Sequence, residues 1–130
     1  MKAYDISKRT LALMFESEVE NVDKAFRNNF CNILSAVAAE SLPYENSIRR
    51  AEGREEMKIA PVISEMEEEL PMSDEICSVA LPFGVAAYFY QDDGENYNSS
   101  IYRERFVNAL YEAKKCFFTD VNDVYGGENI

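Results

Sequence analysis

The stretch from Ile76 to Tyr90 limits the possible folds of this chain more than any other part, because it is apolar on nearly every face. Its large apolar residues recur at the three- and four-residue spacings of an α-helix. A helix without a polar face has to be covered by other elements on all sides. We therefore expect the central helix of a bundle here. It has either a kink or a junction of two short helices near Leu81, since Pro82 and Gly84 interrupt the pattern.

Two helices are predicted before this central one. The first starts after Asp5, a residue type that caps helix N-termini, and covers about residues 6–15. The second carries the clearest apolar stripe of the chain and follows a cap at either Asn21 or Asp23. We expect it to end before Pro43, because the residue that precedes a proline avoids the α conformation.

A final helix is predicted at about residues 100–118, after an acidic turn and with Asn98 or Ser99 as its N-cap. We expect one helical domain over residues 1–120 and an extended C-terminal tail over residues 121–130. The predicted fold is therefore all-α, a compact bundle of about four to five helices.

The segment between the second helix and the central helix is less regular. Gly53 ends a short helical turn there, and residues 57–63 alternate weakly between apolar and polar around Pro61. We expect an irregular or short hairpin arm over residues 53–70. Nine acidic and two basic residues lie between Glu52 and Glu75, so this arm is predicted to be an acidic functional surface.

The composition argues against most catalytic chemistry. No histidine is present, which removes the commonest general base and the commonest metal ligand. The cysteines Cys31, Cys77 and Cys116 are far apart among mostly apolar neighbours, so we expect buried free thiols and a reducing compartment. The acidic turn at Asp92 lacks the ligand spacing of a calcium loop. We predict that the protein is not an enzyme and uses no cofactor, metal or small-molecule substrate.

The formal net charge of -11 restricts the possible partners. A chain this acidic is repelled by phosphate, so neither sequence-specific nucleic-acid binding nor binding to an anionic membrane is expected. No segment reaches the roughly 20 apolar residues of a membrane span, and the N-terminal region lacks the features of a signal peptide. We therefore expect a cytoplasmic protein that acts by binding other proteins.

Two groups of apolar residues and one acidic run are candidates for a subunit or partner interface. Tyr88, Phe89 and Tyr90 occupy successive helical positions and cannot all face one core, so we expect at least one to be exposed or to contact another chain. The valines and the tyrosine of the tail are unusual for a purely solvated segment, and we expect the tail to dock on a neighbour. The predicted interface comprises Glu65, Glu67, Glu68, Glu69, Tyr88, Tyr90, Val121, Val124 and Tyr125.

The order of segments from Leu70 onward has a recognisable pattern. An acidic Leu70-Pro71 stretch leads into an apolar helix interrupted by Pro82 and Gly84, followed by an acidic turn and a final helix. This pattern, over about residues 70–118, resembles the head-to-tail connector proteins, or neck adaptors, of tailed phages and prophages. The resemblance implies a non-enzymatic helical protein that forms a ring between portal and tail proteins in the virion neck and lets DNA pass.

An alternative function is that of a small acidic regulator that binds a basic site on a host protein, as a mimic of DNA does. This alternative predicts an exposed acidic stripe between Glu65 and Glu75 and salt-sensitive binding to one partner. The neck-adaptor hypothesis instead predicts self-association or binding to portal and tail proteins, first in the cytoplasm during assembly and then in the virion neck.

Overall fold

The computed structural model describes the backbone of residues 1–14 and 24–128, and their side chains apart from those of residues 24, 25, 27 and 115–128. The described residues form four α-helices and one π-helical turn, with no strand beyond a single isolated bridge. In chain order these elements are α1 (Ala3–Leu13), α2 (Lys24–Glu52), the π-helical turn η2 (Ile76–Ala80), α3 (Leu81–Asp92) and α4 (Asn96–Glu128). The predicted all-α bundle is confirmed.

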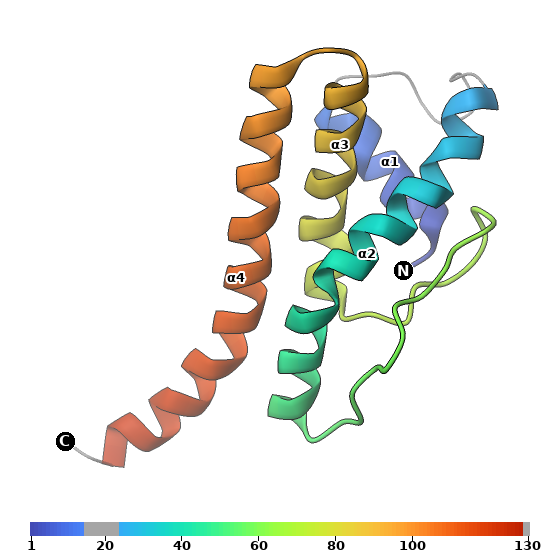
Figure 1. Cartoon of the computed structure of the whole chain (residues 1–130). Coiled ribbons are helices and arrows are strands. Elements are labelled where there is room, and N and C mark those ends of the chain that lie inside the picture. Colours follow the sequence, from blue (N-terminus) through green and yellow to red (C-terminus); the bar gives the residue numbers. More distant parts are fainter. Residues whose placement is uncertain (15–23, 129–130) are drawn as a thin grey trace.

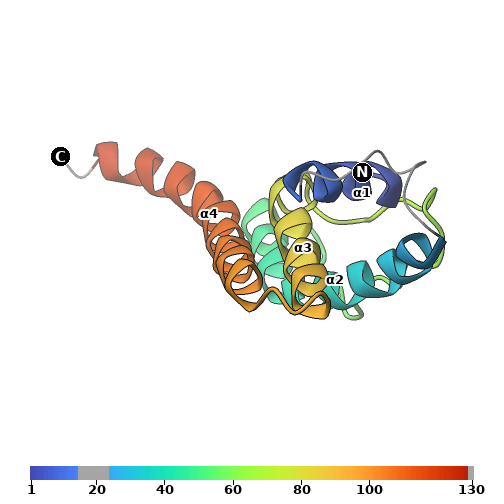
Figure 2. The same cartoon turned by 90° about the horizontal axis from the view of Figure 1, so that it is seen from above.

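Helix α3 occupies the centre of the bundle, as its apolar sequence predicts (Figure 1). It contacts α1, α2 and α4. In two perpendicular views it lies between α4 on one side and α1 with α2 on the other (Figure 2). Leu81 and Val85 of this helix are completely buried, so the helix without a polar face is covered on its sides by the other three.

Helix α1 starts earlier than predicted, and backbone carbonyls of the arm take the place of the expected Asp5 cap. The Ala3 N–H donates to the Glu68 carbonyl at 2.9 Å, and the Tyr4 N–H donates to the Met66 carbonyl at 2.8 Å. Asp5 lies in the first turn, where a negative charge is favourable at the positive end of the helix dipole. A distant segment thus satisfies the first N–H groups of this helix, which the local sequence does not reveal.

Helix α2 continues through Pro43, where the sequence predicts its end. The proline cannot donate a hydrogen bond to the carbonyl of Ala39, and α2 changes direction along its length, as proline-containing helices do (Figure 1). Beyond the proline, Ile48 is fully buried in the core. Tertiary packing of this last part of α2 therefore outweighs the local preference against a helix.

The sequence predicts a helix break at Gly53, and helical structure does end there, but as the end of α2 and not of a separate short turn. Gly53 has a φ of 74°, a conformation that favours glycine. Its N–H donates to the Arg50 carbonyl at 3.2 Å, and the Arg54 N–H donates to the Arg49 carbonyl at 2.8 Å. These two bonds form a Schellman cap, which turns the chain sharply from α2 into the arm.

The predicted interruption near Leu81 takes the form of a π-helical turn followed directly by α3. The Leu81 N–H donates to the carbonyl of Ile76, five residues earlier. Pro82 has no N–H to offer the Ser78 carbonyl, and Nη1 of Arg9 on α1 donates to that oxygen at 3.5 Å. A side chain from a neighbouring helix thus replaces the bond that the proline removes.

Helix α4 begins earlier than predicted. Its first residue is Asn96, directly after a turn in which Gly94 has a φ of 78°, so neither Asn98 nor Ser99 is the N-cap. The Ser99 hydroxyl instead donates to the Ala87 carbonyl of α3 at 2.9 Å. This serine therefore connects α3 and α4 and does not cap the N-terminus of α4.

Helix α4 also continues further than predicted. Its backbone is helical up to Glu128, so residues 121–128 are helical where the sequence predicts an extended tail. In both views this end of α4 leaves the bundle and projects away from the other helices (Figures 1 and 2). The projection of the tail from the body is as expected, but its conformation is not.

The core is formed where the helices meet, and the inner side of the arm contributes to it. Ile63 and Leu70 of the arm are buried together with apolar residues of α2 and α4, among them Phe30, Leu34 and Phe106. The largest fully buried apolar side chains are Phe30, Phe106, Ile6, Leu34, Ile48, Ile76, Leu81, Leu110, Val37 and Val85.

Gly84 permits a very close approach of three helices. A Cβ atom at this position would lie 2.5 Å from Cγ1 of Val37 on α2 and 2.9 Å from Cδ1 of Phe106 on α4. The sequence indicates this glycine as a helix interruption, but α3 continues through it. Its role is to leave room for its neighbours.

We expect Gly84→Ala to lower the free energy of unfolding by about 1–3 kcal/mol, because the added methyl group overpacks this site. The better helix propensity of alanine offsets at most about 1 kcal/mol of that cost. Chemical denaturation followed by circular dichroism measures the change. In a Val37→Ala background the cost should fall to about half or less, since one clashing atom is gone. A variant as stable as the wild type would contradict the packing role.

Candidate protein-interaction surface

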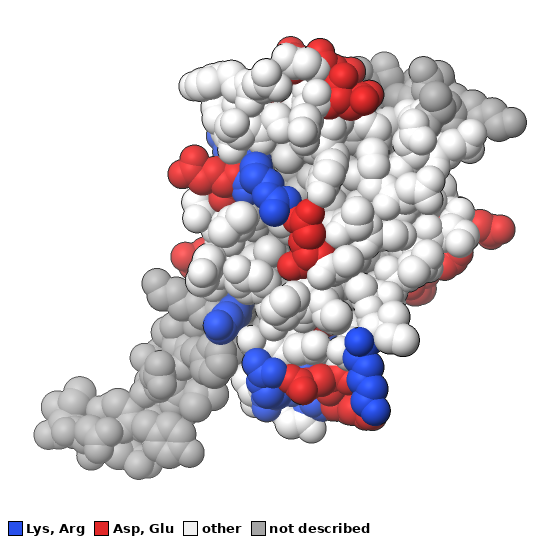
Figure 3. Space-filling model, in the orientation of Figure 1, with Lys and Arg blue, Asp and Glu red and all other residues white. Residues whose placement is uncertain are grey.

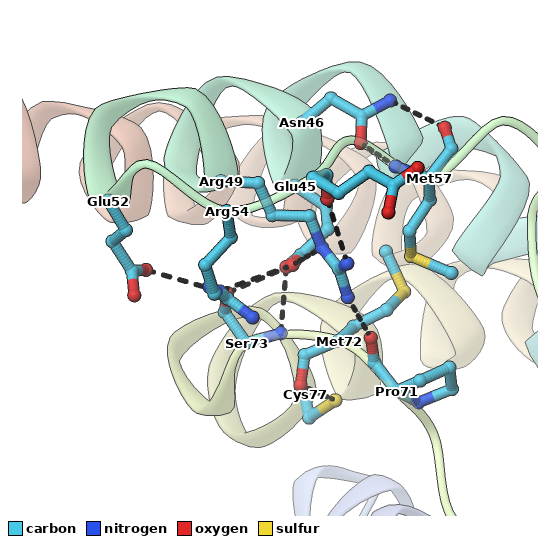
Figure 4. A network of polar contacts seen from close by, with 11 residues as sticks. Glu45, Asn46, Arg49, Glu52, Arg54, Met57, Pro71, Met72, Ser73 and Cys77 are labelled. Atoms are coloured by element: carbon cyan, nitrogen blue, oxygen red, sulfur yellow. Dashed lines mark hydrogen bonds and ion pairs between the residues drawn. The ribbon is translucent and has the colours of Figure 1, made fainter.

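The side chain of Glu45 on α2 is fully buried at the place where the two ends of the arm (residues 53–70) meet (Figure 4). Its carboxylate accepts hydrogen bonds from Nε of Arg49 at 2.9 Å, from the Ser73 N–H at 2.7 Å and from the Ser73 hydroxyl at 3.1 Å. Nη2 of Arg54 lies 3.8 Å away. Both carboxylate oxygens are therefore engaged by the chain itself.

The guanidinium of Arg49 extends this network to the backbone of the arm and its flank. It donates to the Glu55 carbonyl at 3.1 Å and to the Pro71 carbonyl at 2.6 Å. A buried charge is tolerated when it is paired and its hydrogen bonds are complete. The arrangement fits a structural role, because it ties the departing and the returning chain to one point on α2.

Sequence reasoning did not single out Glu45. Glu45 and Arg49 are four residues apart, a spacing at which opposite charges meet on one face of a helix. This spacing would have indicated the ion pair from the sequence if α2 had been predicted to continue past Pro43. The return of Ser73 to the same carboxylate has no local signal, because the two residues are brought together only by the arm.

Two side chains of α2 fix the middle of the arm. Nδ2 of Asn46 donates to the Met57 carbonyl at 2.9 Å, and its Oδ1 accepts from the Met57 N–H at 2.8 Å. The Ser35 hydroxyl accepts from the Ile63 N–H at 2.8 Å and lies 3.3 Å from the Ile63 carbonyl oxygen. The arm is thus irregular, as predicted, but held at Met57 and at Ile63.

Between these two fixed points the arm exposes large aliphatic side chains. Residues 58–62, here named the arm tip, include Ile59 with 80% and Val62 with 75% of its surface exposed. Both views show the arm on the side of the bundle away from α4 (Figures 1 and 2). Neighbouring exposed aliphatic residues on a fixed loop are typical of a surface that binds another protein.

The acidic residues of the predicted interface are located on the returning part of the arm. Glu65, Glu67 and Glu69 are exposed, whereas Glu68 is half-buried. The Glu68 carboxylate accepts hydrogen bonds from two backbone N–H groups of the arm, at 3.0 and 3.1 Å. This glutamate therefore stabilises a turn of the arm.

The N-terminus of the chain neutralises part of this acidic run. Glu67 pairs with Nζ of Lys2 at 3.3 Å, and Glu69 pairs with the amino group of Met1 at 3.0 Å. The hydrogen bond with Glu69 raises the pKa of that amino group. On the face seen in Figure 3, acidic side chains occur in small groups, several of them beside basic ones. In the folded chain, the local net negative charge of this acidic run is therefore smaller than the sequence suggests.

The three successive aromatic residues of α3 are each half-buried, and each contacts another helix of the same chain. The Tyr88 hydroxyl donates to the Glu40 carboxylate of α2 at 2.6 Å, which raises the pKa of the tyrosine. The rings of Phe89 and Tyr90 stack on aromatic rings of α2 and α4 at centroid distances of 4.8 and 5.2 Å. All these contacts lie within one chain, and a contact of these three residues with another subunit stays a prediction.

The remaining predicted interface residues are Val121, Val124 and Tyr125. Their backbone belongs to the projecting part of α4, and their side chains lie outside the described residues. Docking of this segment on a neighbour stays a prediction.

The cysteines that the structure describes are free and buried, as predicted. Cys77 is completely buried, and burial raises the pKa of its thiol to about 11. Burial also raises the pKa of Cys31, whose thiol donates to the Met66 sulfur of the arm at 3.8 Å. The side chain of Cys116 lies outside the described residues.

An open groove of about 780 Å³ lies between α2, α3 and α4, but its central polar groups bind one another. The Glu40 carboxylate in this groove pairs with the Arg103 guanidinium and accepts the Tyr88 hydroxyl. Every buried polar side-chain atom in the described part of the chain has a hydrogen-bond partner. The Glu40, Tyr88 and Arg103 side chains in this groove therefore bind one another.

Among the side chains that the structure describes, no three histidine, cysteine or acidic residues are grouped so that they could hold a metal ion. No helix in the described part of the chain has the length and apolar character to cross a membrane. Comparison of the chain with protein-family models, curated proteins and solved structures finds no match. The arm therefore stands out as the candidate functional surface on its own geometry.

We expect Glu45→Gln to lower the free energy of unfolding by about 3 kcal/mol, because it removes the charge that pairs with Arg49 and Arg54. The control is Glu56→Gln, which breaks an exposed pair with Arg50 and should cost less than about 1 kcal/mol. Denaturation curves of both variants give the comparison. Equal effects of the two substitutions would show that the buried network does not hold the arm.

We expect the Cys77 thiol to resist alkylation in the folded protein at pH 8, because it is buried and its pKa is about 11. The raised pKa means that the free energy of unfolding falls as the pH rises from 9.0 to about 11, since only the unfolded thiol ionises in that range. Mass spectrometry after labelling, in a Cys116→Ser background, tests the first statement. Rapid labelling of Cys77 without denaturant would refute it.

Proposed function

We propose that this chain is a non-enzymatic adaptor that acts by binding other proteins, with the arm tip as a contact to a neighbouring subunit. The observation that carries the proposal is the exposure of Ile59 and Val62 on a backbone fixed on both sides. A surface that is already ordered loses little conformational entropy when it binds. A loop of about 20 residues without regular structure is uncommon in a small domain and is usually functional.

Within this class, we propose that the chain is an adaptor in the neck of a phage or prophage virion, bound to portal and tail proteins. The resemblance of residues 70–118 to such adaptors supports this role. The net charge of -11 supports it too, because a channel for DNA has to avoid gripping phosphate. The projecting end of α4 gives the chain an element that reaches beyond its own bundle (Figure 2).

The alternative function, an acidic regulator that mimics DNA, has less support. Its predicted acidic stripe depends on glutamates of the arm, and two of these, Glu67 and Glu69, are paired with positive groups of the N-terminus. The arm also exposes large aliphatic side chains, at Ile59 and Val62. An apolar tip suits packing against a protein surface more than it suits a basic DNA-binding site.

The test is co-sedimentation of the purified chain with rings of the portal protein from the same genome. We expect the wild-type chain to sediment with the rings at 0.15 and at 0.5 M salt. A chain that ends at Asp120, and so lacks the last part of α4, should bind at least about tenfold more weakly, a change of about 1.4 kcal/mol.

The salt dependence separates the two functions. Binding to portal rings that persists at high salt supports the adaptor, since apolar contacts are little affected by screening. A chain that ignores portal rings at both salt concentrations, or a genome without a portal gene, contradicts the neck role. Capture of one basic partner at low salt only would support the regulator instead.

A further inference from the structure

Lys58 differs from nearly all other basic residues of the described chain, because it lies outside any helix. In the part of the chain that the structure describes, every lysine and arginine except Lys2, Arg54 and Lys58 belongs to α1, α2 or α4. Peptide bonds within a helix are held by its hydrogen bonds, whereas exposed loop tips are the preferred sites of cleavage by proteases. A protease that recognises a basic side chain therefore finds three sites outside helices in this part of the chain.

Two of these three basic residues are held by the fold. Lys2 forms an isolated antiparallel bridge with Glu69, and its Nζ pairs with Glu67 at 3.3 Å. The Arg54 N–H closes the Schellman cap of α2, and its Nη2 binds the Glu52 carboxylate at 3.2 Å. A glutamate also follows Arg54 directly, and its charge is repelled by the acidic pocket with which such a protease binds a basic side chain. Both sites lose contacts when a protease binds them.

Lys58, in the arm tip, lacks these restraints. Its side chain is exposed and has neither an ion pair nor a hydrogen bond with a described residue. From Lys58 to Val62, no backbone N–H or carbonyl forms a hydrogen bond with another described residue. Ile59, on the other side of the peptide bond, has 80% of its surface exposed. Main-chain groups that are free in this way can pair with the edge of a binding cleft, as an extended peptide does.

Both ends of the arm tip stay attached to α2 when a bond within the tip is cut. The Asn46 side chain binds the N–H and the carbonyl of Met57, at 2.8 and 2.9 Å. On the other side, the Ile63 N–H donates to the Ser35 hydroxyl at 2.8 Å, and the Ile63 side chain is buried in the core. A cut after Lys58 therefore releases only residues 58–62 and leaves both parts of the chain in the bundle.

We infer that the Lys58–Ile59 peptide bond is a processing site for a protease that recognises a basic residue before the cut, and that the cut chain keeps its fold. The reaction adds one water molecule across the bond, which leaves a carboxylate on Lys58 and an amino group on Ile59. The cut converts a tip that is fixed on both sides into two free ends. Ile59 and Val62 then lose their fixed positions on the surface.

The test is limited digestion of the full chain with trypsin, a protease of this specificity, under native conditions. We expect the bond after Lys58 to be cut at least tenfold faster than the bond after Arg54. The two fragments on either side of the cut should elute together in size-exclusion chromatography and separate only in denaturant. Mass spectrometry identifies each cut.

Lys58→Gln and Lys8→Gln are matched variants, since each removes one exposed lysine, and Lys8 lies within α1. Lys58→Gln should slow the first cut within the arm at least tenfold, and Lys8→Gln should leave its rate unchanged. Equal or faster cleavage after Arg54 overturns the inference, and so do fragments that separate or lose their helical circular dichroism without denaturant. A stable complex of trypsin with the uncut chain overturns it as well, because the tip is then an inhibitor and not a substrate.

One consequence rests on the proposed function, in which the arm tip contacts a neighbouring subunit. The cut chain should bind portal rings at least about tenfold more weakly than the intact chain, since its tip is no longer ordered before binding. If the cut chain binds as tightly as the intact one, the processing site stands and the proposed contact through the tip is wrong. If the chain is not cut after Lys58 but still sediments with the rings, the processing site is wrong and the adaptor function stands.

Discussion

The hydrogen bonds of the buried Glu45 carboxylate are the interaction on which the arm and the central helix both depend. Glu45 binds Ser73, and the Ser73 carbonyl accepts the N–H groups of Ile76 and Cys77, the first residues of η2. One side chain thus connects the end of α2, the arm and the start of the central helical segment. Buried ion pairs often add little net stability, so its value is in selecting one arrangement of these three parts.

The helices could be predicted from the sequence because each buries an apolar stripe, which is recognised even when the exact first and last residues are not. The predicted helix ends were wrong where a residue far away in the sequence determines them. Pro43 is tolerated because Ile48 behind it is buried, and Asp5 is not the cap because carbonyls of the arm bind the first N–H groups of α1. Gly53 was correctly predicted to break a helical segment, although that segment was taken for a separate short turn, because a Schellman cap depends only on residues close in sequence.

The sequence and the structure point to the same segment as the candidate surface, but to different residues of it. The sequence predicts an irregular arm and indicates its acidic residues as the interface, because charged residues are easily recognised in a sequence. In the structure the exposed aliphatic side chains of Ile59 and Val62 are the more unusual feature. Asn46 and Ser35 hold the arm backbone on either side of these two residues. Such bonds join residues more than ten positions apart, so no periodicity in the sequence indicates them.

Helix α1 links the arm to the central helical segment. Its first N–H groups bind the arm at the carbonyls of residues 66 and 68. Further along the same helix, Arg9 donates to the Ser78 carbonyl of η2. An α-helix of 11 residues is a rigid spacer of about 16 Å. Helix α1 therefore holds the arm at a fixed position relative to the central helix, in addition to the bonds of Glu45.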